Sequence, residues 1–455
     1  MNIIDNYRDL IDEYNTDNPD TPIVIDTIVY SQQQQDAFDL YREGKSFVLF
    51  GSAGSGKSLM IHKMKEYTEK NQLSKQLHIT ATTGISAYNI NGITYQSFMG
   101  IGTGEEPVAD LITRIKKNKA TLKRIKNLDI LIIDEISMMS SDIFDKLNII
   151  FQVFKFNKKF FGGIQLILSG DMLQNTAIFK DHEPKTLLIE NKIFNSTFNM
   201  KKNNIIILDK IFRQDNIEFQ NLLSNIRHGI ITPQDTLMLQ SRHISNFPHL
   251  KDLLELTPTN AKANCINIDK LSRLNSPLFQ SDARFTRSGI NDAIENLLER
   301  ELIKQLTTKN ALQLQLKIGA RVMLTKNIDV LSGLCNGNTG IILNIINNAL
   351  QIKFDNNSVH LITLQEFKLE LDNCYCIAIQ YPVILCFGST ITKCQGLSLT
   401  EAILDLSHCF CEHQVYSALS RLKSLDGLYI RSYNGDRVMV NQKCIDWLQN
   451  LKIKK

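Results

Sequence analysis

The chain has 455 residues, of which 43% are hydrophobic and 22% charged, and its formal net charge is +4. This length exceeds what one hydrophobic core supports, so we expect two or three domains of a globular protein. No run approaches eighteen consecutive apolar residues, which argues against a transmembrane helix and a membrane partner. The first twenty residues are polar and acidic, unlike a secretory or transit signal, so we expect a cytoplasmic or nuclear location.

The nine cysteines all lie between Cys265 and Cys444. The nearest pairs, Cys374 with Cys376 and Cys409 with Cys411, are separated by one residue. Structural zinc sites usually separate such pairs by about two to four residues. We therefore expect free thiols that mostly pack as small apolar side chains, and no structural metal.

Four short runs rich in Val, Ile and Leu predict buried parallel strands. They occupy residues 46–50, 76–80, 128–133 and 164–169, and helical patterns separate them. This alternation is typical of a doubly wound α/β sheet. Polar clusters begin where the strands end, and ligands of such sheets bind at the carboxyl ends of the strands.

The segment GSAGSGKS at 51–58 follows the first of these strands and opens a helical pattern. It is a complete phosphate-loop motif in the context that such a motif requires. Its glycines let the backbone curl so that N–H groups point at phosphate oxygens. Lys57 can reach the β and γ phosphates, and the Ser58 hydroxyl suits a Mg²⁺ ligand. The predicted nucleotide-binding residues are Gly51, Ser52, Ala53, Gly54, Ser55, Gly56, Lys57 and Ser58.

Two later strand ends complete the predicted ATP site. Asp134 and Glu135 end the apolar run at 128–133, where a carboxylate is costly without a cation. We predict that Asp134 holds Mg²⁺ and that Glu135 orients and deprotonates the attacking water. Gln174, in SGDMLQN at 169–175, is predicted to bond the γ-phosphate, with an ordinary loop residue as the equally good alternative.

A second set of apolar runs, at 204–209, 382–387, 401–406 and 427–430, predicts a second α/β sheet. Between them, residues 316–354 favour short strands with Asn-Gly turns, which predicts a small β-barrel inserted at about 275–380. If the second sheet faces the first, Arg213 and Arg421 would enter the ATP cleft and stabilise the transferring phosphoryl group. Either arginine alone is better explained by a surface ion pair.

Two lysine-rich stretches leave a nucleic-acid role open. The first runs from Arg114 to Lys126, and a solvated helix face explains it as well as DNA does. The second, at 151–161, interleaves phenylalanines with lysines. Its apolar spacing favours a core helix over a stacking surface.

Taken in chain order, the motifs resemble the superfamily 1B helicases of the Pif type (petite integration frequency) and, more distantly, RecD. YSQQQQDAF at 30–38 resembles the Q motif, and TATTGISA at 80–87 and NGITYQSFMGIG at 91–102 resemble motifs Ia and Ib. DEISMM and FGGIQLILSGD (161–171) resemble the segment from motif II to motif III. Later matches are KIFRQ with NIRHG (210–229), LTPTNAKAN (256–264), LKIGARVML with NGNTG (316–340), STITKCQGLSL (389–399) and QVYSALSR (414–421).

This resemblance covers roughly residues 28–430 and implies an α/β fold of two RecA-like, doubly wound, parallel-sheet domains. The motor domains would be residues 1–204 and 205–455. A small accessory subdomain would lie at about 100–126, and an SH3-like β-barrel would be inserted at 275–380. The resemblance further implies that ATP and Mg²⁺ are the cofactors, that Gln34 bonds adenine, and that Gln395 and Gly396 contact the nucleotide. The catalytic residues would be Lys57, Glu135, Gln174, Arg213 and Arg421.

The resemblance also implies that single-stranded DNA crosses both motor domains. The implied contacts are Thr83, Thr94, Ser97, Phe98, Thr259, Asn260, Thr390 and Lys393. Small polar groups would hold phosphates, and Phe98 could stack a base. For each threonine taken singly, a local turn or helix cap is the simpler interpretation.

Several positions depart from the family pattern. Gln96 and Thr392 stand where the family has His, Cys394 stands where it has Ser, and Asn175 and Thr176 replace its Pro-rich continuation after Gln174. All lie in DNA-contacting or coupling motifs, whereas the ATP residues are intact. ATP hydrolysis is therefore a safer prediction than unwinding.

From the resemblance we expect an ATP-dependent helicase, monomeric in solution, that translocates on single-stranded DNA and unwinds forked or tailed duplexes 5′→3′. The direction depends on the resemblance alone. One alternative is a DNA-stimulated ATPase that remodels protein–DNA complexes without separating strands. Another is a DNA-binding module that nucleotide switches without hydrolysis.

Overall fold

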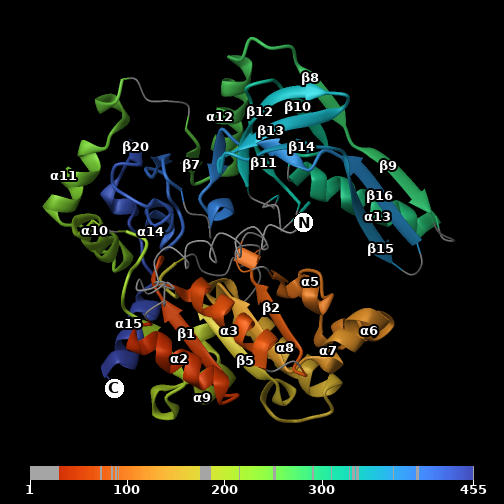
Figure 1. Ribbon diagram of the computed structural model, residues 1–455, viewed down its shortest axis with the longest axis vertical. Helices are drawn as coiled ribbons and strands as arrows, with labels where there is room; N and C mark the ends of the chain where they lie inside the picture. Colours follow the sequence, from red (N-terminus) through yellow and green to blue (C-terminus); the bar gives the residue numbers. More distant parts are fainter. Residues whose placement is uncertain are drawn as a thin grey trace, which may run out of the picture.

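The computed structural model describes residues 30–71, 74–83, 86–87, 90, 92–174, 186–214, 216–248, 253–288, 292–308, 310–326, 328–329, 334, 338–371, 374–395 and 399–453. These residues form a first α/β domain, a second α/β domain and a β-rich insertion beside the second (Figure 1). Within the described residues, no helix is both long and apolar enough to cross a membrane.

The first domain is built on a parallel sheet of six strands in the order β3-β2-β4-β5-β1-β6. Every residue of β1, β4 and β5 is buried, because helices cover both faces of the sheet. All four strands predicted for this half are confirmed. The strands are β1 (Phe47–Gly51), β2 (Leu77–Ala81), β3 (Ile93–Thr94), β4 (Ile130–Asp134), β5 (Gln165–Gly170) and β6 (Ile205–Leu208).

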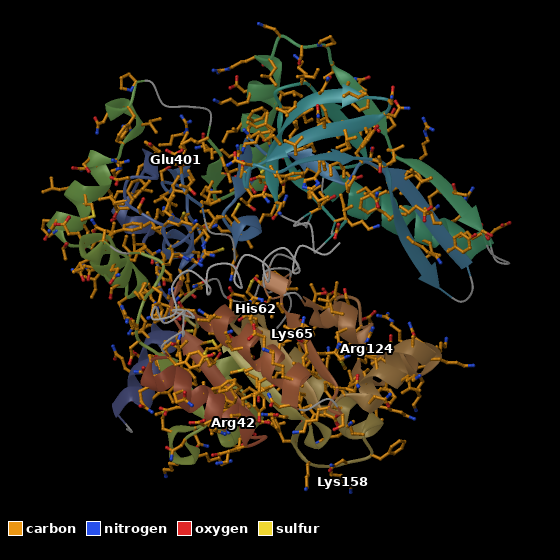
Figure 2. The ribbon with its side chains drawn as sticks, viewed as in Figure 1. Arg42, His62, Lys65, Arg124, Lys158 and Glu401 are labelled. Atoms are coloured by element: carbon orange, nitrogen blue, oxygen red, sulfur yellow. The ribbon has the colours of Figure 1, made fainter. Side chains whose placement is uncertain are left out.

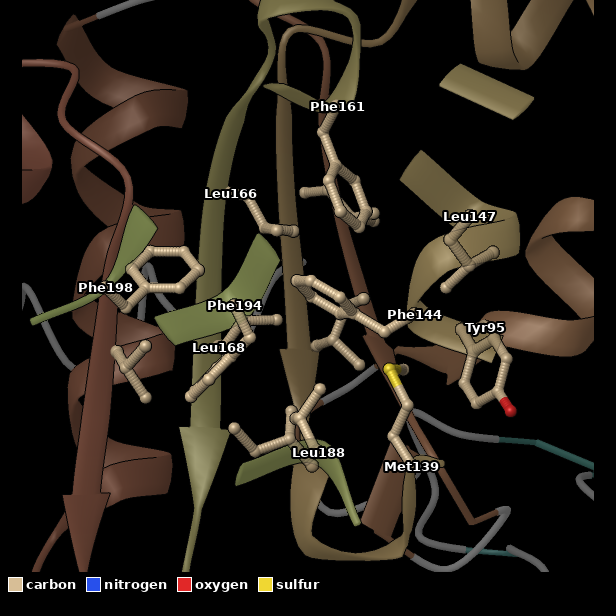
Figure 3. Close-up of a cluster of buried hydrophobic side chains, with 14 of the residues drawn as sticks. Tyr95, Met139, Phe144, Leu147, Phe161, Leu166, Leu168, Leu188, Phe194 and Phe198 are labelled. Atoms are coloured by element: carbon tan, nitrogen blue, oxygen red, sulfur yellow. The ribbon is translucent and has the colours of Figure 1, made fainter. Parts of the chain in front are cut away.

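Helices pack on the two faces of this sheet around two hydrophobic clusters. Figure 3 shows the aromatic part of the larger cluster, in which the rings of Phe144 and Phe161 are 5.1 Å apart. Phe151, Phe154 and Phe161 are buried, but Phe156 is 86% exposed and α8 ends at Phe154, so the 151–161 stretch is only partly the core helix that the sequence predicted. The helices are α2 (Gln32–Arg42), α3 (Lys57–Asn71), α5 (Tyr95–Met99), α6 (Val108–Lys117), α7 (Lys119–Asn127), α8 (Ser141–Phe154), α9 (Lys192–Thr197) and the 3-10 turns η1 (Ile136–Met138), η2 (Phe160–Gly163), η3 (Leu188–Glu190) and η4 (Met200–Lys202).

The second domain has a parallel sheet of four strands in the order β18-β7-β19-β20. Its strands are β7 (Glu255–Thr257), β18 (Gly388–Thr390), β19 (Ala402–Asp405) and β20 (Leu428–Ser432). The helices in this half of the chain are α10 (Ile217–Arg227), α11 (Pro233–Ser241), α12 (Asn260–Ser272), α14 (Gln414–Leu419), α15 (Gln442–Ile453) and the 3-10 turns η5 (Ile244–Asn246), η6 (Thr392–Cys394) and η7 (Gly435–Arg437).

In the described part of the insertion between α12 and β18, the chain forms three antiparallel sheets and one helix. The largest sheet has the order β14-β13-β12-β11-β17, and the smaller ones are β15-β16-β9 and β10-β8. The short strands predicted within 316–354 are therefore confirmed, whereas the SH3-like barrel stays a prediction. The elements are β8 (Phe279–Asp282), β9 (Arg284–Ser288), α13 (Asp292–Thr308), β10 (Gln313–Leu316), β11 (Arg321–Leu324), β12 (Thr339–Ile346), β13 (Ala349–Phe354), β14 (Val359–Ile362), β15 (Gln365–Leu371), β16 (Cys374–Gln380) and β17 (Val383–Leu385).

Three segments lie elsewhere than the sequence predicted. The run at 204–209 was assigned to the second sheet, but β6 pairs in parallel with β1 and so belongs to the first. The run at 382–387 supplies β17 to the antiparallel sheet of the insertion, which therefore extends past residue 380. Helix α15 packs into the core of the first domain through Cys444, Ile445 and Leu451. β6 and α15 therefore pack with the first domain although they lie beyond the predicted boundary at 204/205, and the domain bounds themselves stay a prediction.

Candidate nucleotide site at the domain interface

The phosphate loop connects β1 to α3 and curls tightly at two glycines. Gly54 and Gly56 have φ values of +78° and +91°, which an L side chain rarely adopts. The Lys57 ammonium donates hydrogen bonds to the carbonyls of Gly51 (2.8 Å) and Ser52 (3.0 Å), so the lysine side chain is bound to the backbone of its own loop. Burial lowers the pKa of Lys57, and the carboxylates of Asp171, Glu135 and Asp134 oppose that shift.

The predicted carboxylate pair stands opposite this lysine, at the end of β4. Thr82 holds the turn, because its N–H donates to the carbonyl of Asp134 (3.1 Å) and its hydroxyl donates to that of Glu135 (2.8 Å). Glu135 has a φ of +56°, a strained conformation of the kind that collects at functional sites. Burial raises the pKa of both carboxyl groups, and the neighbouring Asp134 raises that of Glu135 further. The pair therefore needs a positive partner to be fully ionised.

Two arginines, Arg213 and Arg421, form the far wall. Arg213 donates to the carbonyl of Ser420 (3.0 Å), and the Arg421 guanidinium is buried and donates to the carbonyl of Ser417 (2.9 Å). Burial and the neighbouring Arg421 lower the pKa of Arg213 to about 10. Two guanidinium groups are thus held close together despite their repulsion, as expected where an anion is to be bound between them.

These walls enclose one cavity of about 770 Å³. Its lining joins the phosphate loop, the β4 carboxylates, Gln174 and both arginines, and also includes residues of the insertion. The lining residues are Ala53, Gly54, Gly56, Lys57, Ser58, Leu59, Ser86, Asp134, Glu135, Gln174, Phe212, Arg213, Asn338, Asn356, Arg421 and Lys423. All five predicted catalytic residues, Lys57, Glu135, Gln174, Arg213 and Arg421, therefore meet in one place.

Unpartnered polar atoms in the wall of this cavity and beside it indicate what the site is suited to bind. Among the described residues, the buried atoms Gln34 Nε2, Ser55 Oγ and Asp134 Oδ1 have no hydrogen-bond partner. Gln34 completes the capping box of α2, because its side-chain oxygen accepts from the N–H of Ser31 (3.0 Å). Its amide nitrogen is left near Gly56. Such groups are costly in isolation and fit a nucleotide with its cation.

Comparison with models of protein families shows which family this chain is related to. Residues 29–236 match the family described as PIF1-like helicase, and residues 301–345 match the 2B domain of the DNA helicase Pif1. The chain belongs to the PIF1-like helicase family. It is 30% identical to the ATP-dependent DNA helicase PIF1 of Emericella nidulans over 468 aligned residues, which include 90% of this chain. The chain spans 61% of the length of that relative.

Solved structures of the PIF1-like family show the same fold. Pif1 helicase from Candida albicans superposes with a TM-score of 0.82 at 28% identity, over 93% of this chain and all of the other. Pif1 helicase from Bacteroides, in complex with ADP-AlF3 and single-stranded DNA, superposes with a TM-score of 0.74 at 27% identity, over 93% of this chain and 98% of the other. The two parallel-sheet domains of this chain are thus the RecA-like domains expected from the sequence.

Two further predicted nucleotide contacts can be compared with the structure. The Gln395 amide donates to Glu135 Oε2 at 3.4 Å, so it faces the predicted catalytic base. Gly396 lies outside the described residues, as do Asn175 and Thr176. Gln174 is buried, and its side-chain oxygen accepts from Arg421 at 3.5 Å. The loop glutamine is therefore part of the domain interface and not an ordinary surface residue.

The predicted DNA-contacting threonines all cap local structure. Thr94 caps α5 and Thr259 caps α12, each accepting from the backbone N–H three residues later. The Thr83 hydroxyl accepts from the N–H of Ser86 at 3.2 Å, and that of Thr390 from the N–H of Lys393 at 3.3 Å. Capping does not conflict with phosphate binding, because helix starts present N–H groups to anions. A DNA role for these residues, with Ser97 and Asn260, stays a prediction.

The structure contradicts the base-stacking role predicted for Phe98. Its side chain has no exposed surface. The His78 ring lies 4.8 Å from its ring centroid, and the Arg124 guanidinium (labelled in Figure 2) lies over it at 4.9 Å. Arg124 also donates to the carbonyl of Phe98 and so ties α7 to α5. Phe98 therefore holds the accessory helices to the sheet.

Sequence reasoning missed several residues of the interface. Phe212 lies near Gly56 and is 46% exposed, which makes it an aromatic surface at the mouth of the cavity. Asp171, Arg227 and Tyr416 form a polar cluster on the other side of the phosphate loop. All four lie inside segments already matched to family motifs. No sequence signal links them, because their contacts join positions far apart in the chain.

Proposed function

We propose that this chain is an ATP-dependent DNA helicase that hydrolyses ATP to translocate on single-stranded DNA and unwinds duplex DNA 5′→3′. The observation that carries the proposal is the convergence of Lys57, Glu135, Arg213 and Arg421 on one cavity between the two motor domains. A nucleotide-switched binding module has no need of a hydrolytic base and two arginines at the same phosphates. The direction rests on family membership.

Each residue has a defined task in hydrolysis. Lys57 and the loop N–H groups bind the β and γ phosphates, and Glu135 Oε2 accepts the proton of the attacking water. Arg213 and Arg421 stabilise charge that develops on the γ-phosphoryl group and on the leaving oxygen. An arginine in this role contributes about 10³-fold to 10⁵-fold in turnover. Gln174 adds a hydrogen bond to the γ-phosphoryl group and loses it when the phosphate leaves.

The donor set suits Mg²⁺, because an exposed Ser58 hydroxyl and an unpartnered Asp134 oxygen face the same cavity. Ser58 and Asp134 would hold the ion, which would supply charge neutralisation at the phosphates. Phe212 and Gln34 flank Gly56 and would seat the base, the first by stacking and the second by hydrogen bonding. The relative seen with ADP-AlF3 supports a nucleotide at this place.

Single-stranded DNA is the proposed track, and a groove between the second motor domain and the insertion supports it. The groove encloses about 480 Å³ and contains the predicted contacts Asn260, Thr390 and Lys393. Further amides line it, namely Asn264, Asn267, Asn310, Gln313 and Gln315. Amides and two lysines, Lys317 and Lys393, can hold a backbone without reading a fixed sequence. Binding of single-stranded DNA by the Bacteroides relative agrees with this proposal.

The domain organisation that we propose follows the sheets. The first motor domain comprises residues 30–209 together with α15, and it includes the accessory helices α6 and α7 near residues 100–126. The second motor domain comprises residues 210–441, interrupted by the insertion. The insertion is proposed to be the SH3-like element, and its loop residues Asn338 and Asn356 line the ATP cavity. We further propose that the protein acts as a monomer on forked or tailed duplexes.

The ATPase rate with and without single-stranded DNA tests the coupling, with Lys57→Ala as the inactive control. Strong stimulation that Lys57→Ala abolishes is expected. A rate indifferent to DNA would separate the ATP site from the proposed track. Unwinding of duplexes with a 5′ or a 3′ tail then tests direction, because only the 5′-tailed duplex should open. Stimulation without unwinding of either duplex would favour the protein-remodelling ATPase.

A further inference from the structure

A buried polar cluster joins the two motor domains on the side of the phosphate loop away from the nucleotide cavity. Asp171 follows β5 in the first domain, whereas Arg227 ends α10 and Tyr416 lies in α14, both in the second. The Arg227 guanidinium grips the Asp171 carboxylate with two hydrogen bonds, from Nη2 to Oδ1 (2.6 Å) and from Nε to Oδ2 (3.3 Å). The side chain of Asp171 has no exposed surface.

The same cluster contacts the phosphate loop directly. The N–H of Ala53 donates to the Tyr416 hydroxyl at 3.3 Å, and the Arg227 guanidinium lies 6.0 Å from the centre of the Tyr416 ring. Burial raises the pKa of Tyr416 to about 12, so the hydroxyl stays neutral. Burial alone would raise the pKa of Asp171, but Arg227 lowers it, so the carboxylate stays charged. The cluster therefore contains an interdomain ion pair whose carboxylate stays charged at neutral pH.

Asp171 also determines where Gln174 lies. Its carboxylate accepts from the N–H of Leu173 (3.1 Å) and from the Gln174 amide nitrogen (3.4 Å), which fixes the loop after β5. The oxygen of the same Gln174 amide accepts from Arg421 at 3.5 Å. Both ends of this amide are thus fixed by the second domain, one through Arg421 and the other through Asp171 and Arg227.

We propose that Arg227 is a positioning residue for ATP hydrolysis, which acts on Gln174 through Asp171. With Arg227 in place, Gln174 faces the γ-phosphate only when the second domain is seated against the phosphate loop. Gln174 thereby makes turnover depend on the position of the second domain. This inference rests on the proposed ATPase function. Arg227 itself lines no part of the nucleotide cavity.

The test compares Arg227→Gln, Gln174→Ala and the double variant in steady-state ATPase assays on the full chain. Arg227→Gln is expected to lower kcat about 10-fold to 100-fold, because displacing a phosphate-contacting group by about 1 Å has effects of this size. The KM for ATP and the affinity for a fluorescent ADP analogue should stay within about two-fold. In the Gln174→Ala background, Arg227→Gln should lower kcat no further, since both act on one contact.

Arg431→Gln is the matched control. Arg431 grips the buried carboxylate of Glu255 with the same two-point geometry, but this ion pair lies within the second domain, away from Gln174. The variant Arg431→Gln should lower the urea concentration at the unfolding midpoint and leave kcat for ATP unchanged. If Arg227→Gln does not fold, Arg227→Lys keeps the charge without the two-point grip and takes its place.

Two outcomes would overturn the positioning role. One is that the losses in kcat multiply in the double variant, and the other is that Arg431→Gln lowers kcat as much as Arg227→Gln. If the wild-type protein hydrolyses ATP but ignores DNA, the helicase proposal fails while this comparison still holds for basal turnover. If the wild-type protein hydrolyses no ATP, both proposals fail.

Discussion

Replacing Gly54 by alanine tests whether the segment that follows β6 and carries Arg213 (residues 209–214, called the linker below) packs against the phosphate loop. A Cβ atom at Gly54 would lie 2.3 Å from the Cβ of Arg213 and 3.2 Å from its backbone nitrogen. Non-bonded carbon atoms prefer a separation of about 3.5–4.0 Å. The atoms in the way belong to the root of the side chain and to the backbone, so no rotamer change relieves the clash. The linker has to withdraw by about 1 Å or more.

Withdrawal of the linker takes Arg213 away from the phosphates. A misplacement of this size costs about 10²-fold in turnover. Gly54 also has a φ of +78°, and an alanine in the left-handed region costs roughly 1–2 kcal/mol of stability. Gly44→Ala is the matched control for that second effect. Gly44 has a φ of +71° and no atom within 4 Å of the added Cβ, so it carries the backbone strain without the clash.

The assay measures kcat for ATP and the free energy of unfolding in urea for both variants. Both should lose about 1–2 kcal/mol of stability, and only Gly54→Ala should lose turnover. Equal kcat values for the two alanine variants would show that the linker does not sit on the phosphate loop during turnover. The reasoning that assigns Arg213 to the site through this contact would then be wrong.

Glu135→Gln should lower turnover about 10²-fold to 10⁴-fold with nucleotide affinity retained, because an amide cannot take the proton; turnover near the wild-type rate would exclude Glu135 as the base. Phe98→Leu should leave single-stranded DNA affinity unchanged in fluorescence anisotropy, since the ring is buried. A loss of about 1–3 kcal/mol in binding would instead restore the stacking role. Lys393→Ala should reduce the slope of the logarithm of the DNA-binding constant against the logarithm of the salt concentration by about one unit. An unchanged slope would show that Lys393 does not contact the DNA phosphates. Trp447→Ala should cost about 3 kcal/mol in urea unfolding because its ring packs on Phe50; an unchanged midpoint would contradict the docking of α15.

The ATP site was predictable because its functional groups lie in short, continuous segments of the sequence. A phosphate loop needs its glycines, lysine and serine within eight positions, and a buried strand that ends in two carboxylates is conspicuous in any sequence. Each of these segments also needs a fixed local context, a strand before it and a helix or turn after it. Patterns of Val, Ile and Leu supply that context, so the fold of the first domain and its site could be predicted together.

It was harder to predict which sheet each strand joins, because the amino-acid composition of a strand does not indicate its neighbouring strand. The run at 204–209 has the apolar character of a second-domain strand, yet β6 pairs with β1 at the edge of the first sheet. Helix α15 belongs to the second half of the chain but docks Trp447 against Phe50 and Phe194 of the first domain. Both contacts depend on shape complementarity between distant segments, which no local pattern records.

Phe98 shows how a correct motif can predict a wrong role. An aromatic side chain in a DNA-contacting motif favours stacking, but this ring is enclosed by His78 and Arg124. The residue before it, Ser97, is exposed and so is the one available to a ligand. The sequence identifies the segment. The direction of each side chain follows from helix α5, in which neighbouring residues point about 100° apart, so Phe98 is buried while Ser97 is exposed.

The contacts between the domains suggest why the same motor needs two kinds of arginine. Arg213 and Arg421 line the nucleotide cavity, so under the proposed function their contacts change when the γ-phosphate is lost. Arg227 holds Asp171 on the opposite side of the phosphate loop, where no phosphate enters. Gln174 is bonded to both sets of contacts, because its amide oxygen accepts from Arg421 and its amide nitrogen donates to Asp171. Under the proposed function, Gln174 is therefore the side chain through which a change at the γ-phosphate reaches the Asp171–Arg227 contact.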